Sequence, residues 1–234
     1  MNDPSCFTCD IGKAAIYRGV LQNGPECIAA CRSEFAHYGP NRVVMRQDQV
    51  PATIYTVYRG WLYRYRKLAN GRVQIISFVI PGDVIPFISI FRPDTPLFYG
   101  IKSVSHTELC VFDCTRFREG IAADPAFAKP FQMAVAQYLD SLHRRIVDMG
   151  QRSARGRLAQ LLIELFQRHH ARGMTVNNSF EFPVSQELLA KALGLTKAYV
   201  NRTLAGLKKD GIIRLEKKWL TIVDLDGLGR LSER

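Results

Sequence analysis

The chain has 234 residues, of which 47% are hydrophobic, and carries a formal net charge of +11. This length and hydrophobic content predict a folded protein of one or two domains and exclude a largely disordered chain. No apolar run approaches the roughly 20 residues that a transmembrane helix needs, so we expect no membrane span. The N-terminal sequence lacks the features of a secretory signal. We therefore expect a cytoplasmic protein whose six cysteines do not form a disulfide framework.

The first 35 residues hold four cysteines and a short helical pattern, and the pattern changes to strands from about residue 40 to residue 115. Runs rich in β-branched and aromatic residues predict strands at 53–58, 61–66, 72–79, 99–104 and 108–112. The predicted turns between them are Gly60, Asn70-Gly71, Pro81-Gly82-Asp83 and Pro93-Asp94. Short strands at this spacing predict a small barrel or roll.

A long helix is predicted from Pro125, because apolar residues recur there every three or four positions. The residues of this seam are Phe131, Val135, Tyr138, Leu142, Ile146 and Met149. The spacing is close to a heptad repeat, which predicts a dimer interface along the helix. The alternative is a helix that packs on its own barrel. A second helix, at about 154–170, carries five apolar residues that we expect to cover the core of the last domain.

The segment from Phe182 to Ile213 predicts two short helices joined by a turn at Gly194. Ser185 and Thr196 precede the helices as N-caps, because their hydroxyls can accept from first-turn N–H groups. Apolar residues of the second helix recur at Val200, Leu204 and Leu207 and form its buried stripe. The residues left on the exposed face are Lys197, Ala198, Asn201, Arg202 and Ala205.

This exposed face suits the major groove of DNA, where arginine can pair with guanine and asparagine with adenine. The alternative is an ordinary pair of amphipathic helices in a core. Two further features favour DNA. Lys208 and Lys209 end the second helix, and two alternating segments around residues 216–219 predict a basic hairpin, which is the order of a winged helix. In addition, residues 151–234 hold 15 basic and 8 acidic residues, so most of the positive excess lies there.

The order of cysteine-bearing tail, β-roll, long helix and winged helix resembles the CRP/FNR family of bacterial transcription regulators over nearly the whole chain. The residues that carry the resemblance are Gly60, Gly71 and Pro81-Gly82-Asp83 in the roll, and 193–196 with 200–204 at the C-terminus. It implies an α+β fold with a cyclic-nucleotide-binding-like β-roll, a long dimerisation helix and a C-terminal winged helix-turn-helix. The corresponding domains are residues 1–35, 36–124, 125–151 and 152–234.

The resemblance also implies a homodimer whose recognition helices reach half-sites about 34 Å apart on a palindromic site. Arg202 falls on the family's recognition-helix arginine, and Ser185 on a hydroxyl that meets phosphate. The FNR branch has glutamate where this chain has Ala198, so we expect altered base specificity there. The expected DNA-binding residues are Ser185, Thr196, Lys197, Tyr199, Asn201, Arg202, Lys208 and Lys209. The alternative roles are a solvated surface position for Lys197 and partial packing for Tyr199.

The cyclic-nucleotide branch holds ribose and cyclic phosphate with a glutamate and an Arg-Ser pair. The corresponding places in this chain hold Phe87 and Leu97-Phe98. An apolar pair cannot neutralise a buried phosphate, and burying that charge unpaired is costly. We therefore expect neither cyclic AMP nor cyclic GMP to bind.

The cysteines suggest a different signal. Cys6 and Cys9 resemble the opening of the FNR iron–sulfur motif, and Cys110 matches the distant ligand of that branch. Thiolates are suitable ligands for a [4Fe-4S] cluster. The third family position falls near residues 16–17 and supplies no thiol, so the remaining ligand would be Cys27, Cys31 or Cys114. The alternatives are a thiol switch, zinc, haem, an apolar ligand of the roll, or cysteines that simply pack in the core.

The function predicted from the sequence is a homodimeric, sequence-specific transcription regulator that senses a redox, oxygen or small-molecule signal. The expected partners are double-stranded DNA, a second copy of the chain and RNA polymerase, and no membrane. The alternative is a cytoplasmic metal- or thiol-based redox protein with only nonspecific contact to nucleic acid. We expect no enzyme, because no Walker loop, zinc-protease or nucleophile-elbow motif is present.

Overall fold

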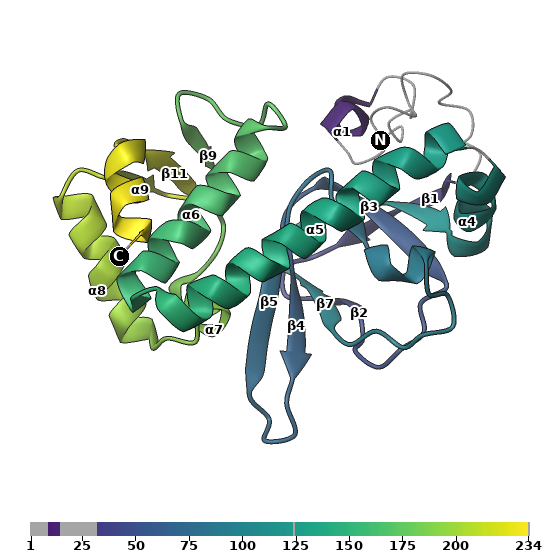
Figure 1. The fold of residues 1–234 in the computed structure, drawn as a ribbon, viewed down its shortest axis with the longest axis horizontal. Coiled ribbons are helices and arrows are strands. Elements are labelled where there is room, and N and C mark those ends of the chain that lie inside the picture. The colour runs from purple at the N-terminus through teal and green to yellow at the C-terminus, as the bar shows by residue number, and fades with distance from the viewer. Residues whose placement is uncertain (1–8, 15–31, 124, 234) are drawn as a thin grey trace. The chain divides into compact units, whose positions relative to one another are not determined.

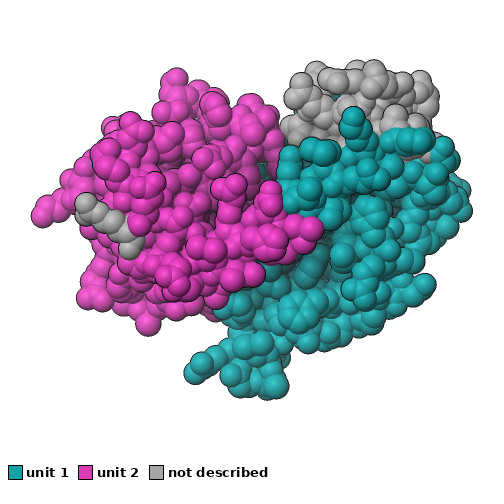
Figure 2. Space-filling view, in the orientation of Figure 1, with its two compact units in different colours: residues 1–138 teal, residues 139–234 magenta. Residues whose placement is uncertain are grey.

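The computed structural model describes residues 9–14, 32–123 and 125–233. The chain forms two compact units, residues 1–138 and residues 139–234 (Figure 2). The long helix α5, Pro125–Gln151, contains the boundary between them. Each unit is described below by itself.

The first unit is a β-roll of two four-stranded antiparallel sheets (Figure 1). One sheet has the order β1-β8-β3-β6 and the other has the order β2-β7-β4-β5. The strands are β1 Arg32–Tyr38, β2 Val43–Met45, β3 Thr53–Arg59, β4 Leu62–Lys67, β5 Val73–Val79, β6 Val84–Ile85, β7 Gly100–Ser103 and β8 Thr107–Asp113. All five predicted strands are confirmed within one or two residues at each end. The three that the sequence analysis missed are β1, β2 and β6.

The glycines predicted as turns hold backbone conformations that favour glycine. Gly60, Gly71 and Gly82 all have positive φ, at 87°, 80° and 89°. Gly60 is also sterically confined, because a Cβ there would lie 2.1 Å from the carbonyl oxygen of His106. The chain reversals that define the roll are therefore determined locally.

One helix follows the last strand of the roll, and a shorter one lies between β6 and β7. Helix α4, Cys114–Ala123, was not predicted, and a short 3-10 helix, η1, spans Phe87–Ile90. The side chains of Phe112, Phe117 and Phe131 meet beside η1, with ring centroids 5.5 Å apart between Phe112 and Phe117 and 5.3 Å apart between Phe117 and Phe131. This aromatic cluster fastens α4 and the start of α5 to the roll. Among the N-terminal described residues, α1 spans Asp10–Ala14.

The second unit is a winged helix. Its elements are α6 Ala154–His170, β9 Ser179–Glu181, α7 Gln186–Leu193, α8 Lys197–Lys209, β10 Ile213–Glu216, β11 Trp219–Ile222 and α9 Leu225–Ser232. The three strands form a sheet in the order β10-β11-β9. The prediction for α6 is confirmed, since all five of its apolar residues are buried: Leu158, Leu161, Leu162, Leu165 and Phe166. Strand β9 and helix α9 were not predicted.

Among the described residues, none of the helices combines the length and the apolar character required to cross a membrane.

Candidate nucleic-acid interface

Two N-caps determine where helices α7 and α8 begin, and one glycine turn connects the helices. The Ser185 hydroxyl accepts from the backbone N–H of Leu188 at 3.2 Å, and the Thr196 hydroxyl accepts from that of Tyr199 at 3.2 Å. Gly194 lies between the helices with φ 65°, in the left-handed region. Both predicted N-caps and the predicted turn are confirmed. Because each is a local interaction, the sequence alone was enough to locate them.

Burial divides α8 into an inner and an outer face. Val200, Leu204 and Leu207 are at most 3% exposed and pack into the core of the unit. Every residue predicted for the outer face is exposed: Lys197, Ala198, Asn201, Arg202 and Ala205. Small alanines flank Asn201 and Arg202, so the amide and the guanidinium stand out from the helix. A helix with this face fits the width of the DNA major groove.

The guanidinium of Arg202 is accessible on this face. No ion pair among the described residues involves Arg202, whose guanidinium lies 6.0 Å from the ring centroid of Tyr199. Tyr199 is half-buried, and its carbonyl oxygen accepts from the Thr203 hydroxyl at 3.0 Å. Asn201 accepts a hydrogen bond from Gln186 at the start of α7. Arg202 is thus exposed and available to a ligand outside the unit.

Further positive charge lies at the C-terminal end of α8 and on the hairpin. Lys208 and Lys209 are exposed in the last turn of α8. In the β10–β11 hairpin, Glu216 pairs with Trp219, so Lys217 and Lys218 form a two-residue loop. Lys217 adopts positive φ, 53°, and both lysines are exposed at the tip. Exposed lysines of this kind provide contacts to phosphate without base specificity.

The predicted seam of α5 is mostly exposed in the single chain. Ile146 and Met149 are 69% and 64% exposed, Tyr138 is 36% exposed, and Val135 and Leu142 are half-buried. Phe131 is different, because it is fully buried in the aromatic cluster of its own unit. Phe131 therefore contributes packing inside the roll and has no surface to offer to a partner. The rest of the seam leaves apolar surface in contact with solvent.

The predicted cysteine ligands that the structure describes are Cys9, Cys110 and Cys114. Cys110 and Cys114 are buried in the apolar cluster around Phe112 and Phe117. The Cys114 thiol donates to the carbonyl oxygen of Ser89 at 3.8 Å, and burial raises its pKa, which disfavours the thiolate.

Cys9 has a different environment, where its sulfur accepts from the backbone N–H of Gly12 at 3.3 Å. No group of three His, Cys, Asp or Glu residues suited to a metal ion occurs within 9–14, 32–123 and 125–233. The described thiols alone therefore do not test the predicted cluster. Cys6, Cys27 and Cys31 lie outside the described residues.

The places of the cyclic-nucleotide ligands are filled by apolar side chains. The Phe87 ring stacks on Phe131 with centroids 6.2 Å apart. Leu97 is 1% exposed, whereas Phe98 is 67% exposed and lies under the Arg66 guanidinium at 4.8 Å. None of these three side chains can pair with a phosphate, as the sequence analysis expected.

The roll contains a buried cation that the sequence analysis missed. Arg64 on β4 is 8% exposed and donates from Nη1 to the Ser77 hydroxyl at 3.0 Å, while its Nε has no hydrogen-bond partner among the described residues. Its guanidinium lies 5.7 Å from the ring centroid of Tyr99. Burial raises the pKa of Tyr99, and the nearby Arg64 opposes that shift. Arg64 and Arg66 occupy equivalent alternate positions of β4, and only the structure shows that Arg64 is the buried one.

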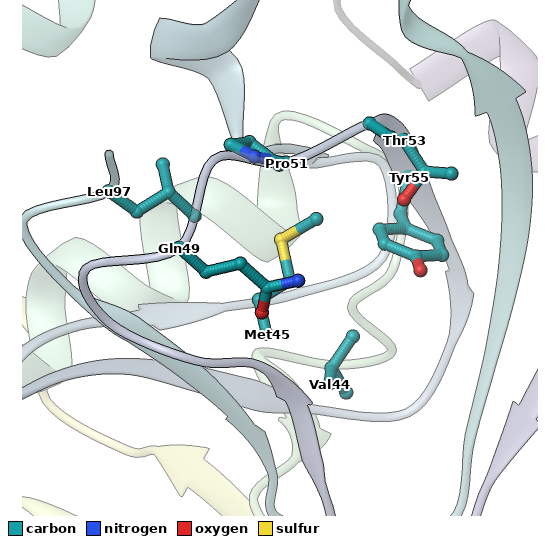
Figure 3. A pocket seen from close by; sticks show the side chains of 8 residues that line it. Val44, Met45, Gln49, Pro51, Thr53, Tyr55 and Leu97 are labelled. Carbon is teal, nitrogen blue, oxygen red and sulfur yellow. The ribbon is translucent and has the colours of Figure 1, made fainter. Parts of the chain in front are cut away.

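A small cavity of about 140 Å³ lies elsewhere in the roll, between the ends of β2 and β3 (Figure 3). Apolar side chains such as Val44, Met45 and Leu97 line it, and Gln49 and Tyr55 supply polar atoms. No charged side chain lines this cavity, so it does not fit a phosphate.

The fold and the exposed recognition helix define the chain as a DNA-binding transcription regulator built from a β-roll and a winged helix. Comparisons with known proteins agree. Residues 35–124 match the family described as the cyclic nucleotide-binding domain, and residues 156–231 match the Crp-like helix-turn-helix domain. The chain belongs to the CRP/FNR family of transcription regulators.

Individual relatives are distant but cover most of the chain. The transcriptional regulatory protein btr of Bordetella pertussis is 23% identical over 226 residues, which span 97% of this chain and 92% of that protein. The anaerobic regulatory protein of Haemophilus influenzae is 26% identical over 192 residues, 82% of this chain and 74% of that protein. The structure of FixK2 from Bradyrhizobium japonicum has the same fold, with a TM-score of 0.74, 22% identity and coverage of 85% and 96%.

Proposed function

We propose that this regulator binds a palindromic DNA site as a homodimer, with α8 of each protomer in the major groove. The observation that carries the proposal is the exposed face of α8, where Asn201 and Arg202 project between small residues and Arg202 has no described ion pair. Arg202 would donate to guanine O6 and N7, and Asn201 would pair with adenine. Six residues around these two would contact the sugar-phosphate backbone of the DNA: Ser185, Thr196, Lys197, Tyr199, Lys208 and Lys209.

Selection from a palindromic DNA library tests this proposal directly. We expect the full-length protein to enrich one palindrome, and Arg202→Ala to lose preference at one base pair in each half-site while it remains dimeric. Lys67→Ala removes one positive charge from the roll and serves as the control for net charge. Selection of the same sites by Arg202→Ala with undiminished affinity would contradict the assignment of the recognition helix.

The proposed dimer interface is the exposed part of the α5 seam, from Val135 to Met149. Two such helices would cover the apolar surface of Ile146 and Met149, as in a coiled coil. Ile146→Glu places a charge in this seam, and we expect it to produce monomers that bind the palindrome at least tenfold more weakly. Gln137→Glu adds the same charge to an exposed position on the opposite side of the helix and should leave the dimer intact. Sedimentation equilibrium measures both variants.

We infer that the roll, residues 36–124, receives a redox, oxygen or small-molecule signal, that α5 carries it, and that residues 152–234 respond on DNA together with RNA polymerase. The support is the apolar filling of the cyclic-nucleotide places, the cysteine-rich N-terminal sequence and the resemblance to a protein named for anaerobic regulation. Iron and sulfide analysis after anaerobic purification tests the cysteine signal. Iron that is lost in Cys9→Ser supports a cluster. If the protein contains no iron, and if neither air nor Cys9→Ser changes its DNA binding, a redox or oxygen signal through Cys9 is excluded. A small molecule would then be the remaining signal.

A further inference from the structure

One contact on the α7–α8 surface joins a residue outside the predicted site to a residue within it. The side chain of Gln186, the first residue of α7, donates from Nε2 to Oδ1 of Asn201 on α8 at 3.3 Å. Asn201 is exposed and Gln186 is half-buried. The two residues are 15 positions apart, so the contact exists only because the helices pack together.

The Ser185 cap and the packing of α7 against α8 fix the backbone positions of both residues. Gln186 directly follows the Ser185 cap, which fixes where α7 begins. The two helices share a core in which Leu189, Val200 and Leu204 are almost fully buried. The Gln186 amide is thereby held beside the outer face of α8, within hydrogen-bond distance of the Asn201 amide.

The hydrogen bond has a chemical consequence for Asn201. An isolated asparagine amide can turn over and present either its oxygen or its nitrogen to a given point. In the structure Gln186 donates from Nε2, so Oδ1 of Asn201 faces α7. In that orientation Oδ1 keeps one acceptor site and Nδ2 keeps both of its N–H donors.

Adenine matches this arrangement. Its major-groove edge presents the N6 amino group as a donor and N7 as an acceptor, whereas guanine presents two acceptors, O6 and N7. Oδ1 of Asn201 can accept from N6 of adenine while Nδ2 donates to N7. With guanine, Oδ1 would face an acceptor and could form no hydrogen bond. We propose that Gln186 is a specificity-determining residue, which orients the Asn201 amide so that α8 prefers adenine over guanine at the base that Asn201 meets. The inference rests on the proposed function of α8.

Competitive binding to a set of half-sites with each base pair varied in turn tests the proposal. The proteins are the full-length wild type, Asn201→Ala, Gln186→Ala and the double variant. We expect Gln186→Ala to lower the adenine preference about fivefold to tenfold at the one position where Asn201→Ala acts. The double variant should have the same base preference as Asn201→Ala alone, because Gln186 acts through Asn201.

Two further variants distinguish orientation from a general contact. Gln186→Glu replaces the donor by an acceptor of similar size, so it should draw Nδ2 of Asn201 towards α7 and reduce the adenine preference as well. Glu187→Ala is the matched control on the same turn, where the Glu187 carboxylate pairs with Lys191 at 2.6 Å. It should shift binding to all sequences by one common factor.

The outcomes separate clearly. A Gln186→Ala variant that weakens all sequences equally, with its adenine preference intact, would overturn the proposal in favour of a phosphate contact. Additive losses in the double variant would overturn it also. A wild type that selects no sequence, with Arg202→Ala indistinguishable from it, would remove the proposed function and this inference together.

Discussion

The winged helix and the roll differ in where they keep their polar side chains. In α8 the apolar stripe is buried, whereas the charged side chains and Asn201 are exposed, so these groups available to a ligand are distinct from the groups that hold the fold. In the roll, Arg64, Cys110 and Cys114 lie inside the structure, where packing alone can account for the two cysteines. Burial therefore indicates a function more directly for the exposed face of α8 than for the interior of the roll, which we propose receives a signal.

The largest expected effect comes from the aromatic cluster that fastens α4 and α5 to the roll. Phe117 is fully buried between Phe112 and Phe131. We expect Phe117→Ala to lower the free energy of unfolding of the first unit by about 3–5 kcal/mol, because it removes a ring and leaves a cavity. Urea unfolding followed by the fluorescence of Trp61, in a Trp219→Phe background, measures it. A loss below about 1 kcal/mol would mean that the cluster is not a structural core.

A second prediction compares how the buried face and the exposed face of α8 contribute to the free energy of unfolding. Leu204 is 3% exposed, and we expect Leu204→Ala to cost about 2–5 kcal/mol of unfolding free energy. Arg202→Ala should change the same quantity by less than about 0.5 kcal/mol, since its side chain is exposed and makes no described ion pair. Hydrogen exchange of the amides of residues 197–209 measures both. A large stability loss in Arg202→Ala would show that the arginine is structural and would weaken the division into two faces.

These contrasts show what the sequence could reveal and what it could not. The caps at Ser185 and Thr196 and the turn at Gly194 depend on neighbours within a few residues, and they were predicted correctly. The contact between Gln186 and Asn201 was not, because it crosses between helices. Strand β1 was missed because its burial does not alternate along the strand.

The seam of α5 illustrates a further limit. Periodicity shows which residues share one face of a helix, but it does not show what covers that face. Phe131 and Ile146 therefore look equivalent in the sequence. In the structure the first is fully buried in its own unit, whereas the second is 69% exposed. Only the packing of the roll distinguishes them.

The roll also provides a pH-dependent test of its own packing. Burial, with the neighbouring Tyr55, raises the pKa of Tyr38 to about 12 from an ordinary value of 10.0. Because the folded state favours the neutral phenol, its contribution to stability is complete below pH 10 and is lost as the pH rises towards 12. We expect the unfolding midpoint in urea to fall between pH 9 and pH 11 and to fall less in Tyr38→Phe. Equal changes in the two proteins would show that Tyr38 is not responsible.

The smallest expected effect concerns the tip of the β10–β11 hairpin and separates phosphate contacts from base contacts. If Lys218 neutralises one phosphate in each protomer, Lys218→Ala should weaken binding to all sequences alike. It should also reduce the slope of log affinity against log salt concentration by about 2 for the dimer. Lys67→Ala, which removes the same charge from an exposed position in the roll, should leave the slope unchanged. Titrations of one labelled palindrome at several salt concentrations measure both slopes. A lower base preference with an unchanged slope would instead place Lys218 among the residues that read the sequence, and the recognition surface would then extend beyond α8 to the hairpin.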